Sequence, residues 1–300
     1  MKYKSDTWLI ILTVLAMFAW GLSWPSGKVL SAYGSPVSIA FLRYVVIFSS
    51  SLLGMLILRK DLRVKKAGLK YLIPAGLLLG FYTYIFISGL KVGFANAGGV
   101  LVTTLNPIFA YSIGLVLAKR WPIKKESAGL FLGLIAGAFQ LNIWTRFDNI
   151  FLYGNMFFLA GAFIWAVMSK FTSKAAKYGS SLAFSLWMYL VALIALFMIV
   201  DLSEIKSIMI AADLRFWLNL LYFGFVATTL ATSIYFYATT RLGAERASSF
   251  IFLVPVSAAL SSWFFLGENI QLYTIFGGIL GILAVFIINY RKPKKAINPD

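Results

Sequence analysis

Ten apolar stretches, each about twenty residues long, follow one another between Trp8 and Arg291 of this 300-residue chain. About twenty helical residues span the roughly 30 Å hydrocarbon core of a bilayer. The pattern therefore predicts an all-α membrane protein with ten transmembrane helices. The predicted spans are 8–30, 37–58, 71–90, 95–117, 127–143, 150–169, 182–200, 216–238, 247–266 and 272–290.

The composition agrees with a membrane protein. Hydrophobic residues make up 61% of the chain and charged residues 12%, and the mean hydropathy is +0.86. A soluble domain carries about a quarter charged residues. Ten spans with short loops use the whole length, so we expect no soluble domain. The chain contains no Cys and no His, which removes thiolate and imidazole chemistry.

The second five spans repeat the first five. Residues 16–44 align without a gap with 161–189 at an offset of 145, and the offset becomes 148 after the loop 201–214. Because five is odd, the second copy must enter the bilayer from the opposite side, as in many secondary transporters. We therefore expect two inverted five-helix repeats, 1–146 and 147–300. The aligned pairs include Trp20 with Trp165, Tyr44 with Tyr189, and Pro107 with Pro255.

The basic residues predict the orientation. With both termini inside, 21 of the 27 Lys and Arg residues lie on the inner side, as the positive-inside rule requires. The loop 59–70 is strongly basic, whereas its repeat equivalent 201–214 carries three acids and one Lys. The net charge of +17 is thus mainly an orientation signal. It is spread over short loops and indicates contact with anionic lipids, not with nucleic acid.

Several sequence landmarks occur in a fixed order: Trp20, Phe41-Leu42-Arg43-Tyr44, Asn106-Pro107, Pro255, Leu266-Gly267-Glu268, and Gly277-Gly278 with Gly281. In this order they resemble the EamA-type branch of the drug/metabolite transporter superfamily, over essentially the whole chain. This resemblance implies an exporter of small metabolites, in some members amino acids, in the bacterial inner membrane. One departure is that Lys119-Arg120 stands where the second repeat has Gly267-Glu268.

Polar and aromatic residues near the middle of the spans predict a substrate cavity. Pro107 and Pro255 break their helices and each free a carbonyl one turn back. An uncharged aromatic pocket suits a zwitterionic or neutral metabolite with an apolar part. For any single residue, helix packing or a bond back to the preceding turn is the alternative. The predicted substrate-binding residues are Trp20, Tyr82, Thr103, Asn106, Trp165, Thr232 and Tyr235.

Arg43 is the one charge clearly inside a span, about two turns from the outer side. A charge at that depth is costly unless it pairs, snorkels or faces water. Glu268 lies at similar depth, and we expect the two to form an outer gate. The alternative is that Arg43 snorkels to the interface and pairs with headgroups or Asp148.

Three function classes remain. A transporter that exports a metabolite by alternating access is favoured, and a channel or sensor on the same fold is the alternative. A membrane-embedded enzyme lacks a base, since no His and no paired carboxylate lies in a span. The same lack favours transport without proton coupling, unless Glu268, Glu126 or backbone carbonyls couple an ion. We expect no metal and no cofactor.

Glycine-rich faces on the fifth and tenth spans predict close helix packing. A dimer seam is the less favoured interpretation, so we expect a monomer in the lipid bilayer. The glycines are Gly129, Gly133, Gly137, Gly277 and Gly281.

Overall fold

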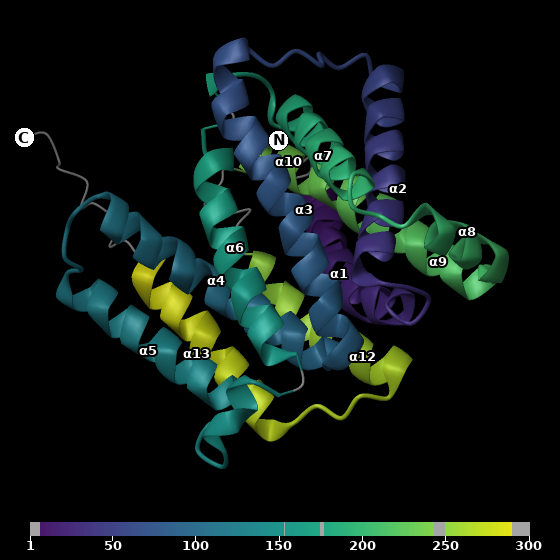
Figure 1. Ribbon diagram of the computed structural model, residues 1–300. Coiled ribbons are helices and arrows are strands. Elements are labelled where there is room, and N and C mark those ends of the chain that lie inside the picture. The colour runs from purple at the N-terminus through teal and green to yellow at the C-terminus, as the bar shows by residue number, and fades with distance from the viewer. Residues whose placement is uncertain (1–6, 153, 175–176, 243–249, 290–300) are drawn as a thin grey trace, which may run out of the picture.

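The computed structural model describes residues 7–152, 154–174, 177–242 and 250–289, which form helices joined by loops (Figure 1). The only β-structure within these ranges is an isolated bridge between Val64 and Gly179. The helices are α1 (Thr7–Leu30), α2 (Pro36–Ile57), α3 (Leu69–Val92), α4 (Ala95–Leu117), α5 (Lys124–Gln140), α6 (Asn155–Thr172), α7 (Ser181–Phe197), α8 (Leu202–Ala211), α9 (Leu214–Leu221), the π-helical segment η4 (Tyr222–Leu230), α10 (Ala231–Leu242), α12 (Leu253–Leu266) and α13 (Leu272–Asn289).

Six helical segments among the described residues are long and apolar enough to cross a membrane. They are α1, α2, α3, α4, α6 and the continuous stretch Leu214–Tyr235. A further candidate is the pair α7 and α8, which is bent by 104°. Helices α5, α12 and α13 lie in predicted spans but are shorter. The protein is therefore a helical membrane protein, and the count of ten spans stays a prediction.

Two of the differences from the predicted boundaries have a local cause. The loop predicted at 201–214 contains helix α8, because the Asp201 carboxylate accepts a 2.8 Å hydrogen bond from the Ser203 N–H and caps the helix. The sixth helix begins at Asn155 rather than at 150 because Gly154, with φ of +75°, precedes it. Only glycine fits there, since an added Cβ would lie 2.6 Å from the Gly89 carbonyl oxygen. Residues 247–249 of the ninth predicted span lie outside the described residues.

Repeat-related serines begin two of the helices. Ser35 caps α2 by accepting a hydrogen bond from the Ser38 N–H, and Ser180 caps α7 by accepting one from the Ala183 N–H. These serines are 145 residues apart, the offset found in the sequence. The local signal that starts a helix is thus present in both halves.

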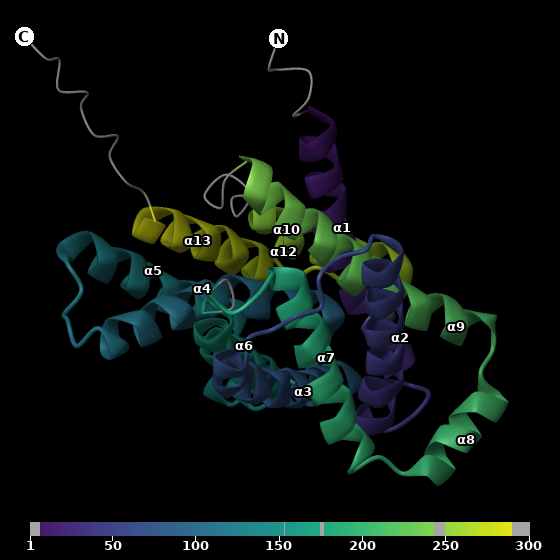
Figure 2. The same ribbon diagram turned by 90° about the horizontal axis from the view of Figure 1, so that it is seen from above.

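Helices from the two halves interleave. Helix α1 packs against α12, α4 packs against α6 and α12, and α3 packs against α6 and α7. Helices α5 and α13 lie side by side at one edge of the bundle, while α8 and α9 project at the opposite edge (Figures 1 and 2). Neither half forms a separate bundle, so any cavity at the centre has walls from both.

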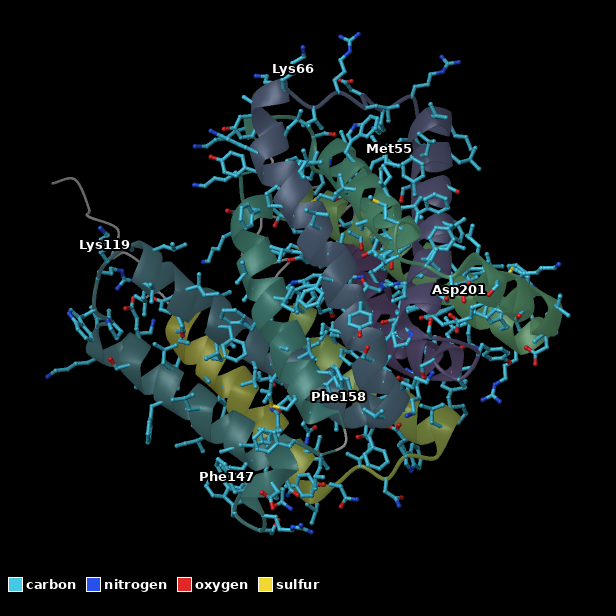
Figure 3. The ribbon with its side chains drawn as sticks, viewed as in Figure 1. Met55, Lys66, Lys119, Phe147, Phe158 and Asp201 are labelled. Atoms are coloured by element: carbon cyan, nitrogen blue, oxygen red, sulfur yellow. The ribbon has the colours of Figure 1, made fainter. Side chains whose placement is uncertain are left out.

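The loops of the predicted two sides lie apart in Figure 3. Lys66 and Lys119, from predicted inner loops, are toward the top and left of the view. Phe147 and Asp201, from predicted outer loops, are toward the bottom and right. This arrangement defines the two ends of the bundle, which are called inner and outer below in keeping with the predicted orientation.

The glycine-rich faces pack within the chain. A Cβ added at Gly277 would lie 2.4 Å from Gln140 Cγ and 2.8 Å from the Ala136 carbonyl oxygen of α5. Gly129 faces α13 in return, where a Cβ would lie 2.5 Å from Ile288 Cγ1. The glycines therefore let α5 and α13 approach closely, as predicted.

Replacing Gly277 by Ala should destabilise the protein by about 1–3 kcal/mol, because the new methyl group overpacks the seam between α5 and α13. Gly54 in α2 is a matched control, since nothing lies within 4 Å of an added Cβ there. Gly54→Ala should leave the melting temperature equal or slightly higher, because alanine favours helix. Thermal unfolding of both variants in the same detergent measures the difference, and equal melting temperatures would contradict the close packing.

Candidate functional site

The outer end of the bundle is held by hydrogen bonds between the two halves. Glu204 on α8 accepts hydrogen bonds of 2.6 Å from both the N–H and the hydroxyl of Ser35, and a further short bond from the Ser38 hydroxyl. Desolvation acts to raise the pKa of Glu204, but the bonds from Ser35 and Ser38 outweigh it and hold the pKa below its ordinary value. The carboxylate thus stays ionised at the start of α2, where the helix dipole favours it.

A second contact joins the same loops. The Tyr33 hydroxyl donates a 2.7 Å hydrogen bond to Asp213, which also caps α9 through the Phe216 N–H. Lys28 and Lys91 tie the neighbouring outer loop to this corner. The Lys28 ammonium donates to the carbonyl oxygens of Leu90 and Gly93 at 2.6 and 2.7 Å, and Lys91 donates to Gly34 at 3.1 Å.

Glu268 makes a third contact between the halves. Its two carboxylate oxygens accept 2.8 Å hydrogen bonds from the N–H groups of Ala95 and Asn96, the first residues of α4. Lys28 is close enough to attract the carboxylate. A helix N-terminus has free N–H groups and a partial positive charge, so a buried carboxylate is well accommodated there.

The expected ion pair between Arg43 and Glu268 is not formed in this structure. Arg43 instead donates a 3.1 Å hydrogen bond to the Thr228 hydroxyl, and its guanidinium lies 3.7 Å from the centre of the Phe223 ring. Its Nε is enclosed by protein. Arg43 faces η4, whereas Glu268, which follows the end of α12, faces the start of α4.

The predicted substrate-binding residues fall into two aromatic pairs and three separate polar residues. Tyr82 and Trp165 are in edge contact, with ring centres 4.9 Å apart, and Trp20 contacts Tyr235 at 5.3 Å. Thr103 bonds back to the Gly99 carbonyl oxygen at 2.5 Å, as the packing alternative expects. The structure therefore does not gather all seven residues around one cavity.

Asn106 and Thr232 are half-buried, and neither side chain makes a hydrogen bond within the described part of the chain. Neither predicted helix break interrupts a helix, because α4 continues through Pro107 and Pro255 lies in the first turn of α12. The two prolines lie in different surroundings. Pro255 is buried, whereas Pro107 lines a pocket. Polar groups left without partners in a bundle are candidates for water or ligand contact.

The pocket at Pro107 lies toward the inner end, between α4, α6 and α13. It has a volume of about 510 Å³ and runs along α4 to Ala118 and Arg120, with Lys170 on its far wall. The lining is Pro107, Ala110, Tyr111, Gly114, Leu115, Ala118, Arg120, Lys170, Val285 and Ile288. It thus connects a predicted helix break to the predicted inner loops.

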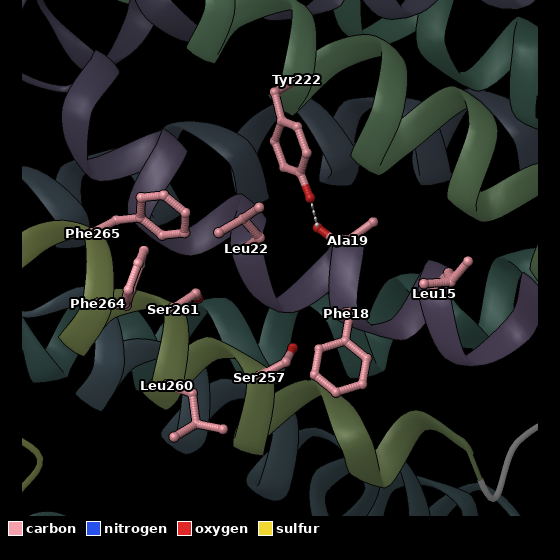
Figure 4. A pocket seen from close by; sticks show the side chains of 10 residues that line it. All are labelled: Leu15, Phe18, Ala19, Leu22, Tyr222, Ser257, Leu260, Ser261, Phe264 and Phe265. Carbon is pink, nitrogen blue, oxygen red and sulfur yellow. Dashed lines mark hydrogen bonds between the residues drawn. The ribbon is translucent and has the colours of Figure 1, made fainter. Parts of the chain in front are cut away.

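A second pocket, of about 440 Å³, lies between α1 and α12 (Figure 4). Its lining is almost entirely apolar, with Phe18, Leu260 and Phe264 among the side chains, and the Tyr222 hydroxyl donates to the Ala19 carbonyl oxygen at 3.1 Å beside it. Such a surface fits lipid chains as well as any solute, so it identifies no ligand.

Glu126, a candidate for proton coupling, is already paired. Arg120 donates hydrogen bonds of 2.7 and 3.0 Å to its two oxygens, and the Ile123 N–H donates a third. The bonds from Arg120 lower the pKa of Glu126 to about 2. A carboxyl with that pKa does not exchange a proton near neutral pH, which weakens the coupling alternative for this residue.

The sequence did not single out Glu204, Ser35 or Phe223. The sequence indicates Glu204 only as one of the acids in the loop 201–214. A carboxylate that accepts hydrogen bonds at a helix N-terminus is nevertheless a known stabilising arrangement. Phe223 carries no polar signal, so its contact with Arg43 required the structure.

The apolar helices, the interleaved halves and the polar side chains enclosed between them define the class: a polytopic membrane protein with polar groups inside a bundle built from both halves of the chain. The profile of the EamA-like transporter family matches residues 7–141 and 152–290. The chain belongs to the EamA-like transporter family.

Similar proteins agree with this family. A Salmonella typhimurium protein named "Probable amino-acid metabolite efflux pump" is 25% identical over 92% of this chain and 93% of its own. A Bacillus subtilis protein named "Uncharacterized transporter YoaV" is 26% identical over 93% of this chain and 95% of its own. A solved structure described only as a crystal structure of a protein matches with a TM-score of 0.59 over 95% of this chain and 96% of its own, at 17% identity. That likeness concerns the fold alone.

Weakening the outer contacts should expose the chain beneath them. Because the chain has no cysteine, Ser26→Cys, buried near the outer end of α1, gives a single labelling site. Adding Glu204→Gln or Glu268→Gln should raise the rate of labelling by an outside, membrane-impermeant maleimide about tenfold, the effect of losing about 1.4 kcal/mol of charged hydrogen bonding.

Asp201→Asn is the matched control, because the Asp201 carboxylate bonds to Ser203 and to the Glu204 backbone at the start of its own helix and not to the other half of the chain. It should leave the labelling rate of Cys at position 26 unchanged. Equal rates in all backgrounds would mean that these carboxylates do not hold the outer end closed.

Proposed function

We propose that this protein is a secondary transporter that exports a small, partly apolar metabolite, such as an amino acid, across the bacterial inner membrane by alternating access. The observation that carries the proposal is the difference between the two ends. The outer end is joined by Glu204, Asp213 and Glu268, while a pocket at Pro107 extends toward the inner loops. A carrier waiting for an internal substrate has this form.

The inverted repeat is part of the same proposal. The two segments that match the family, 7–141 and 152–290, support repeats at 1–146 and 147–300. The packing of α1 on α12 and of α4 on α6 supports it as well, because a two-fold axis in the membrane plane exchanges one pair for the other. Transport then consists of rocking the interleaved halves around the site between them.

An amino acid is the substrate class that the relatives favour. The Salmonella typhimurium relative carries the words "amino-acid metabolite efflux pump" in its name. The paired rings of Tyr82 with Trp165 and of Trp20 with Tyr235 offer apolar surface with polar edges. Such surfaces suit a zwitterion with an apolar side chain.

Counterflow in proteoliposomes tests the carrier. Vesicles loaded with a mixture of the standard amino acids should take up at least one labelled amino acid, saturably and faster than unloaded vesicles. A channel gives no such stimulation. Asn106→Ala and Trp165→Ala should each lower the uptake rate about tenfold or more at unchanged melting temperature. Asn106→Ala removes an amide that has no partner, and Trp165→Ala removes one ring of the pair with Tyr82. Full uptake in both variants would remove these residues from the site.

We further propose that transport is not coupled to protons. The carboxyl of Glu126 stays ionised beside Arg120 and has no proton to exchange near neutral pH. Addition of a protonophore should leave the counterflow rate unchanged, and an imposed pH gradient should not drive accumulation. Accumulation against the amino-acid gradient that the protonophore abolishes would establish coupling.

A further inference from the structure

Arg43 is a partly buried cation, with its Nε enclosed by protein, for which the described part of the chain supplies no anion. Tyr44, Tyr82 and Tyr189 are the groups close enough to interact with it electrostatically, and none of them is acidic near neutral pH. It lies eight residues after Ser35, the cap of α2, or about 12 Å below the outer end. A charge so near the centre of a bilayer marks a functional site by default.

The hydrogen-bonding capacity of Arg43 is largely unused. A guanidinium has five N–H donors, and the structure records one hydrogen bond, from Nη2 to Thr228. Nε is buried without any partner. Buried donors without acceptors are rare in folded proteins and call for an explanation. The geometry of the free donors matches a carboxylate, which binds guanidinium through two parallel bonds.

The segment that faces Arg43 is irregular. Both of its contacts, Phe223 and Thr228, belong to the π-helical segment η4. The Thr228 hydroxyl also donates to the Phe223 carbonyl oxygen five residues back at 3.0 Å. π-helical turns are frequent at functional sites. Nε is covered here, so a ligand reaches it when α2 and η4 separate.

The fold itself does not require a cation at this position. With the repeat offset of 145, the equivalent of Arg43 is Met188, which is buried at 4% exposure. The adjacent tyrosines, Tyr44 and Tyr189, are also equivalent and contact each other, with ring centres 6.4 Å apart. One half thus packs this position with an apolar side chain, while the other half keeps a charge.

We propose that Arg43 binds the carboxylate of the transported metabolite, with Thr228 and Tyr82 as polar neighbours and the Phe223 ring beneath the guanidinium. The assignment rests on the proposed transport function and gives its substrate class: a small molecule with a free carboxylate. An amide or ester of the same molecule lacks the anion and is rejected, because it leaves the Arg43 charge uncompensated.

Ligand binding to the purified protein tests the assignment without transport. Thermal unfolding, followed through the fluorescence of the nine Trp residues, is measured with each standard amino acid, with the amide of the most stabilising one, and with inorganic phosphate and phosphatidylglycerol. The wild type should bind that amino acid at least tenfold more tightly than its amide. Arg43→Met should lose this discrimination.

The empty Arg43→Met variant should melt at or above the temperature of the wild type, because Met188 shows that methionine fits the equivalent position. A purely structural arginine predicts the opposite. Arg215→Met, which removes an exposed charge on α9, is the matched control and should keep the wild-type discrimination between acid and amide.

Three results would overturn the assignment: no amino acid stabilises the wild type, acid and amide bind equally, or Arg43→Met keeps the discrimination. Stronger Arg43-dependent stabilisation by phosphate or phosphatidylglycerol than by any amino acid would assign a phosphate or headgroup instead. Counterflow separates this proposal from the transport function. Counterflow of a metabolite without a carboxylate would support the transport function and contradict the proposed role of Arg43. Carboxylate binding without counterflow would support the role of Arg43 and contradict the transport function.

Discussion

A bilayer offers no hydrogen-bond partners, so every polar group in this chain must find its partner within the protein. Backbone groups inside the helices satisfy one another, and the exceptions are the helix ends. At the outer end the starts of α2 and α4 obtain partners from Glu204 and Glu268 in the other half. The same hydrogen bonds thus satisfy the helix N-termini and close the outer end.

The same constraint explains why helices were predictable and contacts were not. Hydropathy and the repeat offset are local or pairwise features of the sequence, and they located α1 to α4 within a few residues. Hydropathy does not predict helix α8, because it is short and carries polar residues. The start of α6 was not predicted correctly, because it depends on the close approach of Gly154 to Gly89, a contact made only in the folded chain.

The candidate site shows a similar division. The sequence predicts similar depths for Arg43 and Glu268 but not the direction in which each side chain points. Each residue turns a helix by about 100°, and Glu268 lies beyond the end of α12. The pairing of Tyr82 with Trp165 and of Trp20 with Tyr235 follows from α3 meeting α6 and α1 meeting α10. That choice of neighbours is set by the whole bundle. The sequence therefore predicts the chemical character of these residues but not which residues they contact.

The acidic residues of the outer contacts affect the relative free energies of the inward-open and outward-open states. At the position equivalent to Glu268 the first half carries Arg120, which bonds to Glu126 of its own half. An arginine offers no acceptor to a helix N-terminus. If the halves exchange roles by inversion, the inner end has no counterpart of the Glu268 bond with which to close. With the proposed orientation, the basic inner loops would then also bias the resting equilibrium of the empty protein toward the inward-open state from which the proposed export begins.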